Sequence, residues 1–126
     1  YTQVDFDTIL RESDILSVHA PLNEYTNNLM DINAFSKMKP NSIFINVGRG
    51  PIVNETDLTY ALNNNLIASA GLDVLSVEPM SPDNPLLNVN DKDKLLITPH
   101  IGWASIEART NLMQIISGQI KEFFSL

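Results

Sequence analysis

Residues 43–73 decide the fold class of this chain, and they read IFINVGRGPIVNETDLTYALNNNLIASAGLD. This stretch opens with a short apolar run and turns at glycines. It then places Leu58, Ala61 and Leu62 at the spacing of one helical face, and it ends in a second apolar run. Asn54 stands where its side chain can accept a hydrogen bond from a free amide of the first helical turn. The stretch therefore predicts a strand, a capped helix and a second strand in succession.

Apolar runs of strand length recur outside this stretch. The chain has four, at residues 15–18, 43–47, 66–70 and 95–98. Most of them lack a regular alternation with polar residues, which is typical of strands that helices cover on both faces. Helical patterns lie at residues 7–13 and 31–38, after Asn54 and after Ser105. Because strands that alternate with helices are joined by right-handed crossovers, we expect an α/β fold with a parallel sheet.

The last helix has the clearest apolar pattern in the chain. Ser105 is placed to cap it, and its apolar stripe would consist of Ala108, Leu112, Ile115, Ile116, Ile120 and Phe123. Gly118 interrupts this helix, and we interpret it as a point of close packing. Ahead of the last strand, residues 77–90 contain three prolines, so we expect a loop there. A loop of this length inside a domain is usually functional.

Composition limits the class of protein. The 126 residues suit one domain, and 44% hydrophobic against 18% charged residues is a globular balance. Lys and Arg number 8 against 15 Asp and Glu, so the net charge of −7 disfavours a nucleic-acid or anionic-membrane partner. The absence of cysteine rules out disulfides and thiolate metal sites, and two histidines rule out a multi-histidine metal site. With no signal-peptide pattern in view, we expect a cytoplasmic protein.

The residues that follow the four apolar runs carry most of the chemistry in the sequence. They are His19 to Pro21, Gly48 to Gly50, Gly71 to Asp73 together with Glu78, and Pro99 to Gly102. In an open α/β sheet, ligands bind beyond the carboxyl ends of the strands. If the runs are parallel strands, both histidines, one arginine and two carboxylates meet at this edge.

Such a group of side chains suits proton transfer on a small acid. A histidine beside a carboxylate is a tuned acid or base, and a guanidinium can bind a carboxylate through two parallel hydrogen bonds. Redox chemistry would require a cofactor, because neither side chain can store a hydride. Structural roles remain open at this point for all five polar residues. His100 could form a hydrogen bond within its loop, His19 could be a structural residue or line a ligand site, and Arg49 could cap a turn. Asp73 and Glu78 could simply be solvated loop residues.

Three strings of the sequence, in this order, resemble motifs of the D-isomer-specific 2-hydroxyacid dehydrogenases. Residues 44–55 resemble the arginine motif of that family, residues 71–79 its glutamate motif and residues 98–103 its histidine motif. Residues 19–26 resemble a further stretch that borders the coenzyme. The similarity covers essentially the whole chain. It implies a Rossmann-like fold, a doubly wound parallel sheet with helices on both faces.

The resemblance also implies a role for each matching residue. His100 would be the catalytic acid and base, Glu78 would favour its protonated state, and Arg49 would bind the substrate carboxylate. The cofactor-binding residues would be His19, Pro21, Val47, Gly48, Asp73 and Gly102, with Asp73 on the nicotinamide carboxamide. The cofactor would be NAD, with NADP as the alternative, and no metal would take part.

Within the family, the chain is most similar to the glycerate dehydrogenases, also called hydroxypyruvate reductases. Residues 73–79, 83–87 and 103–109 carry that similarity, and Glu78 stands where the related formate dehydrogenases have glutamine. The implied function is reduction of hydroxypyruvate or glyoxylate to D-glycerate or glycolate, by a homodimer. Two alternatives remain open: a phosphoglycerate dehydrogenase, and a coenzyme-sensing interaction module like the corepressors that share this fold.

The chain contains no Gly-rich phosphate turn of the form G-x-G-x-x-G, which the family carries ahead of the arginine motif. We therefore expect residues 1–126 to be the C-terminal portion of the dinucleotide-binding domain, with the phosphate turn and the substrate domain absent. Such a fragment would show little turnover by itself. The strand at residues 15–18 would also have a bare apolar edge, which favours aggregation.

Overall fold

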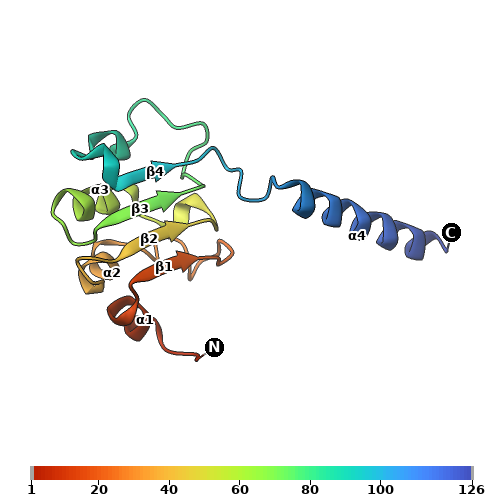
Figure 1. Ribbon diagram of the computed structural model, residues 1–126, viewed down its shortest axis with the longest axis horizontal. Helices are drawn as coiled ribbons and strands as arrows, with labels where there is room; N and C mark the ends of the chain where they lie inside the picture. The colour runs from red at the N-terminus through yellow and green to blue at the C-terminus, as the bar shows by residue number, and fades with distance from the viewer. Residues whose placement is uncertain (1, 126) are drawn as a thin grey trace.

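Four α-helices and four strands are found in residues 2–125, the part of the chain that this computed structural model describes (Figure 1). The helices are α1 (Phe6–Glu12), α2 (Ile32–Lys37), α3 (Glu55–Asn63) and α4 (Ile106–Phe124). The strands are β1 (Ile15–Val18), β2 (Ile43–Asn46), β3 (Ser69–Leu72) and β4 (Leu95–Ile97). Short 3₁₀ helices lie in the connections: η1 (Gly50–Ile52), η2 (Pro85–Asn88) and η3 (Lys92–Lys94).

The strands form one parallel sheet in the order β1-β2-β3-β4, and their arrows all point the same way in Figure 1. Leu16 of β1 pairs with Phe44 of β2, which pairs with Ala70 of β3. Helices α2 and α3 connect consecutive strands, whereas only 3₁₀ helices lie between β3 and β4. The predicted parallel α/β sheet is confirmed. All four carboxyl ends consequently lie at one edge.

One strand lies further along the chain than the apolar run that predicted it. The run covers residues 66–70, whereas β3 begins at Ser69 and ends at Leu72. Asn65 takes a left-handed φ of 56° after α3, and the amide of Leu66 returns to the Ala61 carbonyl. Residues 66–68 therefore belong to the connection between α3 and β3. Asp73 therefore follows the strand directly, and its amide bonds to the Asn46 carbonyl.

The hydrophobic core lies between the sheet and helices α1 to α3. Leu16, Phe44 and Ala70 are neighbours across the sheet and are all buried. The ring of Phe35 in α2 meets that of Phe44 edge to face, with centroids 5.4 Å apart. From α3, the predicted face of Leu58, Ala61 and Leu62 is buried in the same core.

The predicted helix caps form as expected. The Asn54 side chain accepts a hydrogen bond from the amide of Asp57 at 3.0 Å. The Ser105 hydroxyl accepts one from the amide of Ala108 at 3.1 Å. Each cap satisfies a backbone donor that the first helical turn would otherwise leave unpaired.

The opposite face of the sheet is exposed in residues 2–125. Successive strand residues point to opposite faces, so the neighbours of the buried residues point away from the helices. Ile15 is 62% exposed, Ile43 is 38% exposed and Leu96 is 66% exposed. The expected parallel sheet is therefore covered by helices on one face, and the expectation of helices on both faces is not met within the described residues.

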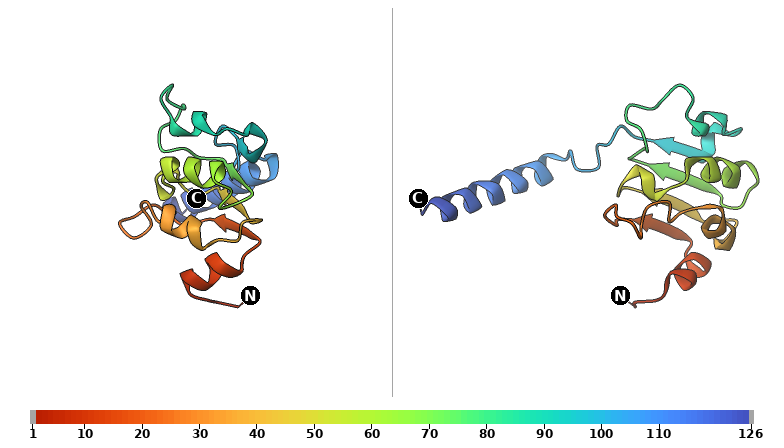
Figure 2. Two further views of the ribbon diagram at one scale, coloured as in Figure 1. Left: turned by 90° about the vertical axis from the view of Figure 1, so that its left-hand side faces the viewer. Right: turned by 180° about the vertical axis from the view of Figure 1, so that it is seen from behind.

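Helix α4 leaves the carboxyl edge of the sheet and points away from it, as Figure 1 and the right-hand view of Figure 2 show. None of its described residues is buried, and its predicted apolar stripe faces solvent. The interpretation of Gly118 as a point of close packing is wrong, since a Cβ there would meet nothing within 4 Å. No helix in residues 2–125 has both the length and the apolarity that crossing a membrane requires.

The exposed apolar surface predicts that the 126-residue chain self-associates. Replacing Ile116 and Ile120 of α4 by lysine should shift the chain toward the monomer, because it places charge in the exposed stripe. The apparent mass at several concentrations, measured by size exclusion with light scattering, tests this. Gln114→Lys adds charge to the same helix outside the stripe and should leave the mass unchanged. A wild-type chain that stays monomeric and melts in one sharp transition would contradict the prediction.

Candidate active site

The structure distributes most of the predicted site residues between two cavities at the carboxyl edge. One, of about 680 Å³, is lined by Asp73, Glu78 and His100 together with Leu75, Pro79, Met80, Ile97, Thr98 and Pro99. The other, of about 530 Å³, is lined by His19, Pro21, Val47, Gly48 and Arg49 together with Ala20 and Leu22. The predicted acid–base pair therefore shares one cavity, while the arginine lies among the residues predicted to line the coenzyme.

His100 and Glu78 are hydrogen-bonded to each other. Nδ1 of His100 lies 2.9 Å from Oε2 of Glu78, and Oε1 of Glu78 accepts a hydrogen bond from the Leu75 amide at 2.8 Å. The Leu75 amide, followed by His100, holds the pKa of Glu78 below its ordinary value of 4.5, so Glu78 is a carboxylate at neutral pH. A carboxylate at Nδ1 favours a proton on that nitrogen, which leaves Nε2 as the atom that can exchange a proton with a ligand.

The backbone of His100 is in the left-handed region, with φ 54°. This conformation costs a non-glycine residue roughly 1–2 kcal/mol, so the surrounding contacts must enforce it. The His100 amide bonds to the Thr98 carbonyl at 3.0 Å, and the indole Nε1 of Trp103 donates to the His100 carbonyl at 2.9 Å. Nothing in the sequence distinguished Trp103 as a partner of His100.

Asp73 accepts three hydrogen bonds from the histidine loop, residues 98–102. Its Oδ1 accepts from the hydroxyl of Thr98 at 2.6 Å and from the amide of Ile101 at 2.9 Å, and its Oδ2 accepts from the amide of Gly102 at 2.8 Å. Burial by itself raises the pKa of Asp73, but these hydrogen bonds outweigh it, and the pKa lies below the ordinary 3.8. Since a carboxylate has about four acceptor positions, one remains on Oδ2 for a ligand.

Arg49 lies on a turn that a buried amide side chain shapes. Asn46 donates through Nδ2 to the Arg49 carbonyl at 3.0 Å and accepts from the Gly48 amide at 3.0 Å. The exposed guanidinium donates one hydrogen bond to the Gly48 carbonyl at 2.8 Å, so most of its donors remain available. Sequence reasoning missed Asn46, although a polar residue inside an apolar run was a signal that could have found it.

The long loop that carries Glu78 is attached to α3 by Glu55. Oε1 of Glu55 accepts from the Ser76 amide at 2.7 Å, and its Oε2 accepts from Nδ2 of the buried Asn84 at 2.9 Å. The sequence predicted this loop, but it did not single out Glu55, which lies 21 residues before Ser76. An acidic residue in a first helical turn is ordinary, so the sequence carried no signal for this contact.

The cavity around Arg49 combines an apolar wall with a histidine and a closely packed backbone. The exposed Val47 supplies an apolar wall, and His19 is held by Ser17, with Oγ and Nε2 2.9 Å apart. A Cβ on Gly48 would lie only 2.9 Å from the Ala20 carbonyl oxygen, so the backbone there is packed too closely for a side chain. The acceptor position left on Asp73 belongs to the other cavity, beside His100.

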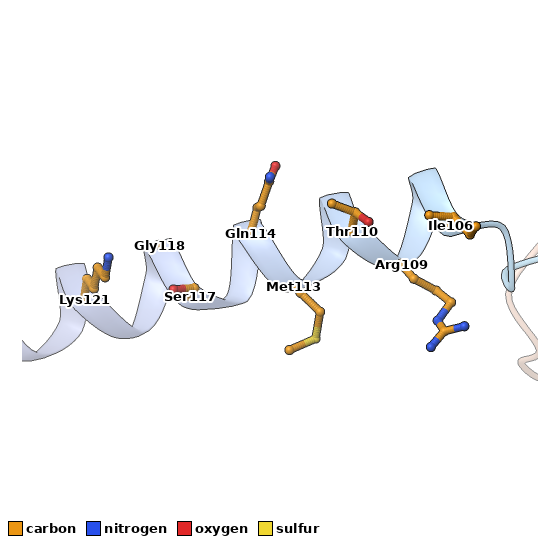
Figure 3. A pocket seen from close by; sticks show the side chains of 8 residues that line it. All are labelled: Ile106, Arg109, Thr110, Met113, Gln114, Ser117, Gly118 and Lys121. Carbon is orange, nitrogen blue, oxygen red and sulfur yellow. The ribbon is translucent and has the colours of Figure 1, made fainter.

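A further hollow, shown in Figure 3, is lined by α4 alone and includes none of the predicted site residues. Its lining residues are Ile106, Arg109, Thr110, Met113, Gln114, Ser117, Gly118 and Lys121. In residues 2–125, no group of three histidine or acidic side chains is arranged to hold a metal ion.

Comparison with known families and proteins relates this geometry to a chemistry. The family model described as "D-isomer specific 2-hydroxyacid dehydrogenase, NAD binding domain" matches residues 1–102. A hydroxypyruvate reductase of Blautia hydrogenotrophica is 42% identical over 120 residues, which are 95% of this chain and 36% of that protein. A glyoxylate/hydroxypyruvate reductase B of Salmonella newport is 47% identical over 109 residues, which are 86% of this chain and 33% of that protein.

Solved structures of the same family also resemble this chain. The NAD-complexed D-isomer specific 2-hydroxyacid dehydrogenase of Lactobacillus delbrueckii ssp. bulgaricus superposes with a TM-score of 0.80 at 30% identity. The match covers 94% of this chain and 39% of that one. The chain therefore spans about a third of the length of the curated relatives that it matches.

Substitution of Gly50 by alanine should destabilise the fold. A Cβ at Gly50 would lie 1.9 Å from the Leu75 carbonyl carbon, so the arginine turn and the glutamate loop would have to separate. Overpacking of this kind costs about 1–3 kcal/mol or more, which urea unfolding would measure. Gly71→Ala is the matched control, since nothing lies within 4 Å of its Cβ. Equal stability of the two variants would contradict the prediction.

Substitution of Asp73 by asparagine should destabilise the fold in a pH-dependent way. Because the folded pKa lies below 3.8, the ionised carboxylate stabilises the folded state above pH 3.8, and this stabilisation is lost as pH falls through the lowered value. At neutral pH the variant should lose about 1–3 kcal/mol, because an amide nitrogen cannot accept the loop's hydrogen bonds.

Urea unfolding of wild type and Asp73→Asn at neutral pH and below pH 3.8 measures this difference, which should shrink in acid. Asp83→Asn, at an exposed carboxylate of the neighbouring loop, should have little effect at either pH. A difference between wild type and Asp73→Asn that stays constant with pH would show that the charge of Asp73 does not stabilise the loop.

Proposed function

The chain belongs to the D-isomer specific 2-hydroxyacid dehydrogenases, and from this membership we propose that the whole protein carrying it reduces a small 2-keto acid to a D-2-hydroxy acid. The observation that carries the proposal is the His100–Glu78 pair beside a buried Asp73, in one cavity at the carboxyl edge. The two named relatives support hydroxypyruvate or glyoxylate as the substrate.

We propose residues 1–126 as the C-terminal portion of a dinucleotide-binding domain. The share of each relative that the chain covers supports this, as does the lack of a Gly-rich phosphate turn in the sequence. The exposed apolar surface of the sheet and of α4 supports a homodimer as the assembly of the whole protein.

His100 supplies the proton in this proposal. When hydride adds to the keto carbon, negative charge develops on the keto oxygen, and the proton on Nε2 neutralises it. Glu78 stabilises the imidazolium before the transfer, because its carboxylate is ionised at neutral pH and lies 2.9 Å from Nδ1. In the reverse direction, neutral Nε2 accepts the proton of the hydroxyl group.

Arg49 binds the substrate carboxylate and polarises the keto oxygen. Its planar guanidinium matches a carboxylate through two parallel hydrogen bonds, and only one of its donors is bonded to Gly48. A side chain at Gly48 or Gly50 would meet the backbone of Ala20 or Leu75, so the turn that carries the arginine is closely packed. This packing supports the backbone from which the guanidinium extends.

A nicotinamide coenzyme in its reduced form, NADH or NADPH, would supply the hydride when bound. His19, Pro21, Val47 and Gly48 would form its wall. Asp73 would accept a hydrogen bond from its carboxamide, and the exposed backbone of Gly102 lies beside that carboxylate.

The proposal is tested by offering hydroxypyruvate, glyoxylate and phosphohydroxypyruvate separately to the whole protein with NADH or NADPH. Oxidation of the coenzyme with hydroxypyruvate or glyoxylate is the expected result. Turnover of the phosphorylated acid alone would instead indicate a phosphoglycerate dehydrogenase. Coenzyme binding without turnover of any acid would overturn the proposal in favour of a coenzyme-sensing module.

His100→Ala should lower kcat in the whole protein by about 10²–10⁴-fold, because the proton donor is lost. NADH binding, followed by fluorescence titration, should be retained, since most of the predicted coenzyme contacts lie in the other cavity. His19→Ala is the comparison variant and should weaken coenzyme binding with a smaller loss of kcat. Full activity of His100→Ala would refute the role given to this histidine.

A further inference from the structure

Trp103 is the only tryptophan of the chain, and its large aromatic side chain is exposed. It is 60% exposed, so packing contributes little to holding it. Its one hydrogen bond in the described structure runs from Nε1 to the carbonyl of His100 at 2.9 Å. An exposed indole that is directed at the carbonyl of a single residue acts on the conformation of that residue.

One carboxylate binds the loop around His100 on both sides of the histidine. Asp73 accepts from the hydroxyl of Thr98 ahead of the histidine, and from the amides of Ile101 and Gly102 behind it. A chain attached to one side chain at both ends must turn tightly between them, and several kinds of tight turn include a residue of positive φ. Glycine is the usual residue for that conformation, whereas here it is His100.

The peptide that follows His100 is held at both of its polar groups, since Asp73 binds the amide of Ile101 and Trp103 binds the carbonyl of His100. Because a peptide is planar, its rotation would move both groups together and break both of these hydrogen bonds. The indole of Trp103 holds this carbonyl, and the amide of Ala104 closes the next turn onto the carbonyl of Ile101 at 2.9 Å. The imidazole is therefore aligned with Glu78 by the backbone as well as by its own hydrogen bond.

We propose that Trp103 and Asp73 are positioning residues that hold His100 in its left-handed conformation from two sides, Trp103 through the carbonyl of His100 and Asp73 through its neighbours. The proposal rests on the function proposed for His100, but it concerns a conformation that can be measured without turnover. It gives Asp73 a role beyond the coenzyme contact, since three of its four acceptor positions are used by the loop.

The indole N–H provides a direct probe, because a chain with one tryptophan gives one such NMR signal. In the 126-residue chain this proton should exchange with water about threefold to tenfold more slowly than in free indole, as expected for one hydrogen bond in a partly exposed position. Asp73→Asn should abolish this protection, since the carbonyl of His100 moves once its neighbours are released. Exchange at the rate of free indole in the wild type would overturn the proposal.

The reciprocal variant is Trp103→Phe, which keeps an aromatic ring and removes the donor. The amides of Ile101 and Gly102 should then exchange faster by a similar factor, whereas the stability of the fold should be nearly unchanged. Tyr60→Phe and Asp83→Asn are matched controls, at an exposed ring and an exposed carboxylate elsewhere. Unchanged exchange at both amides in Trp103→Phe would count against a role of the indole.

Kinetics of the whole protein separate positioning from coenzyme binding. Trp103→Phe should lower kcat about threefold to tenfold and leave the KM for the coenzyme unchanged. A rise in that KM with unchanged kcat would show that Trp103 contacts the coenzyme and would overturn the proposal. Full activity of His100→Ala would instead refute the proposed function. The exchange measurements would still decide whether Trp103 and Asp73 hold His100 in its left-handed conformation.

Discussion

The parallel alignment of four short strands is the constraint on which the rest of this structure depends. Because β1 to β4 run in one direction, the segments after their carboxyl ends come to one edge of the sheet. Residues from four separate parts of the chain can then act on one ligand. Each segment leaves the sheet with its direction already set by the strand before it, which places the side chains that directly follow a strand.

Buried polar side chains turn this edge into a shaped site. Asn46 forms the arginine turn, Asp73 holds the histidine loop and Asn84 attaches the glutamate loop to Glu55. In the described residues every buried side-chain nitrogen or oxygen has a hydrogen-bond partner. This matters because an unpaired polar group in the interior costs about 1–3 kcal/mol. Displacing one of these loops would break the hydrogen bonds of a buried polar group, which favours the arrangement observed.

The same structure separates a covered face of the sheet from an uncovered one. Alternation along each strand sends Phe44 toward the helices and Ile43 away from them. Helix α4 shows a similar division, since its apolar stripe is regular but faces solvent. An apolar stripe predicts that a helix face is suited to burial. It does not predict which surface covers that face, because many surfaces of similar shape and hydrophobicity could pack against it.

The sequence by itself determined the features that depend on neighbouring residues: the order of strands and helices, the caps at Asn54 and Ser105, and the parallel sheet that follows from their alternation. It also placed His100 and Glu78 at one edge. Tertiary structure decided the rest. The partners of Asp73 lie 25 or more residues away, and Glu55 reaches Ser76 across 21 residues. Such contacts form only when loops that are distant in sequence meet in the folded chain. Local propensity and periodicity therefore cannot predict them.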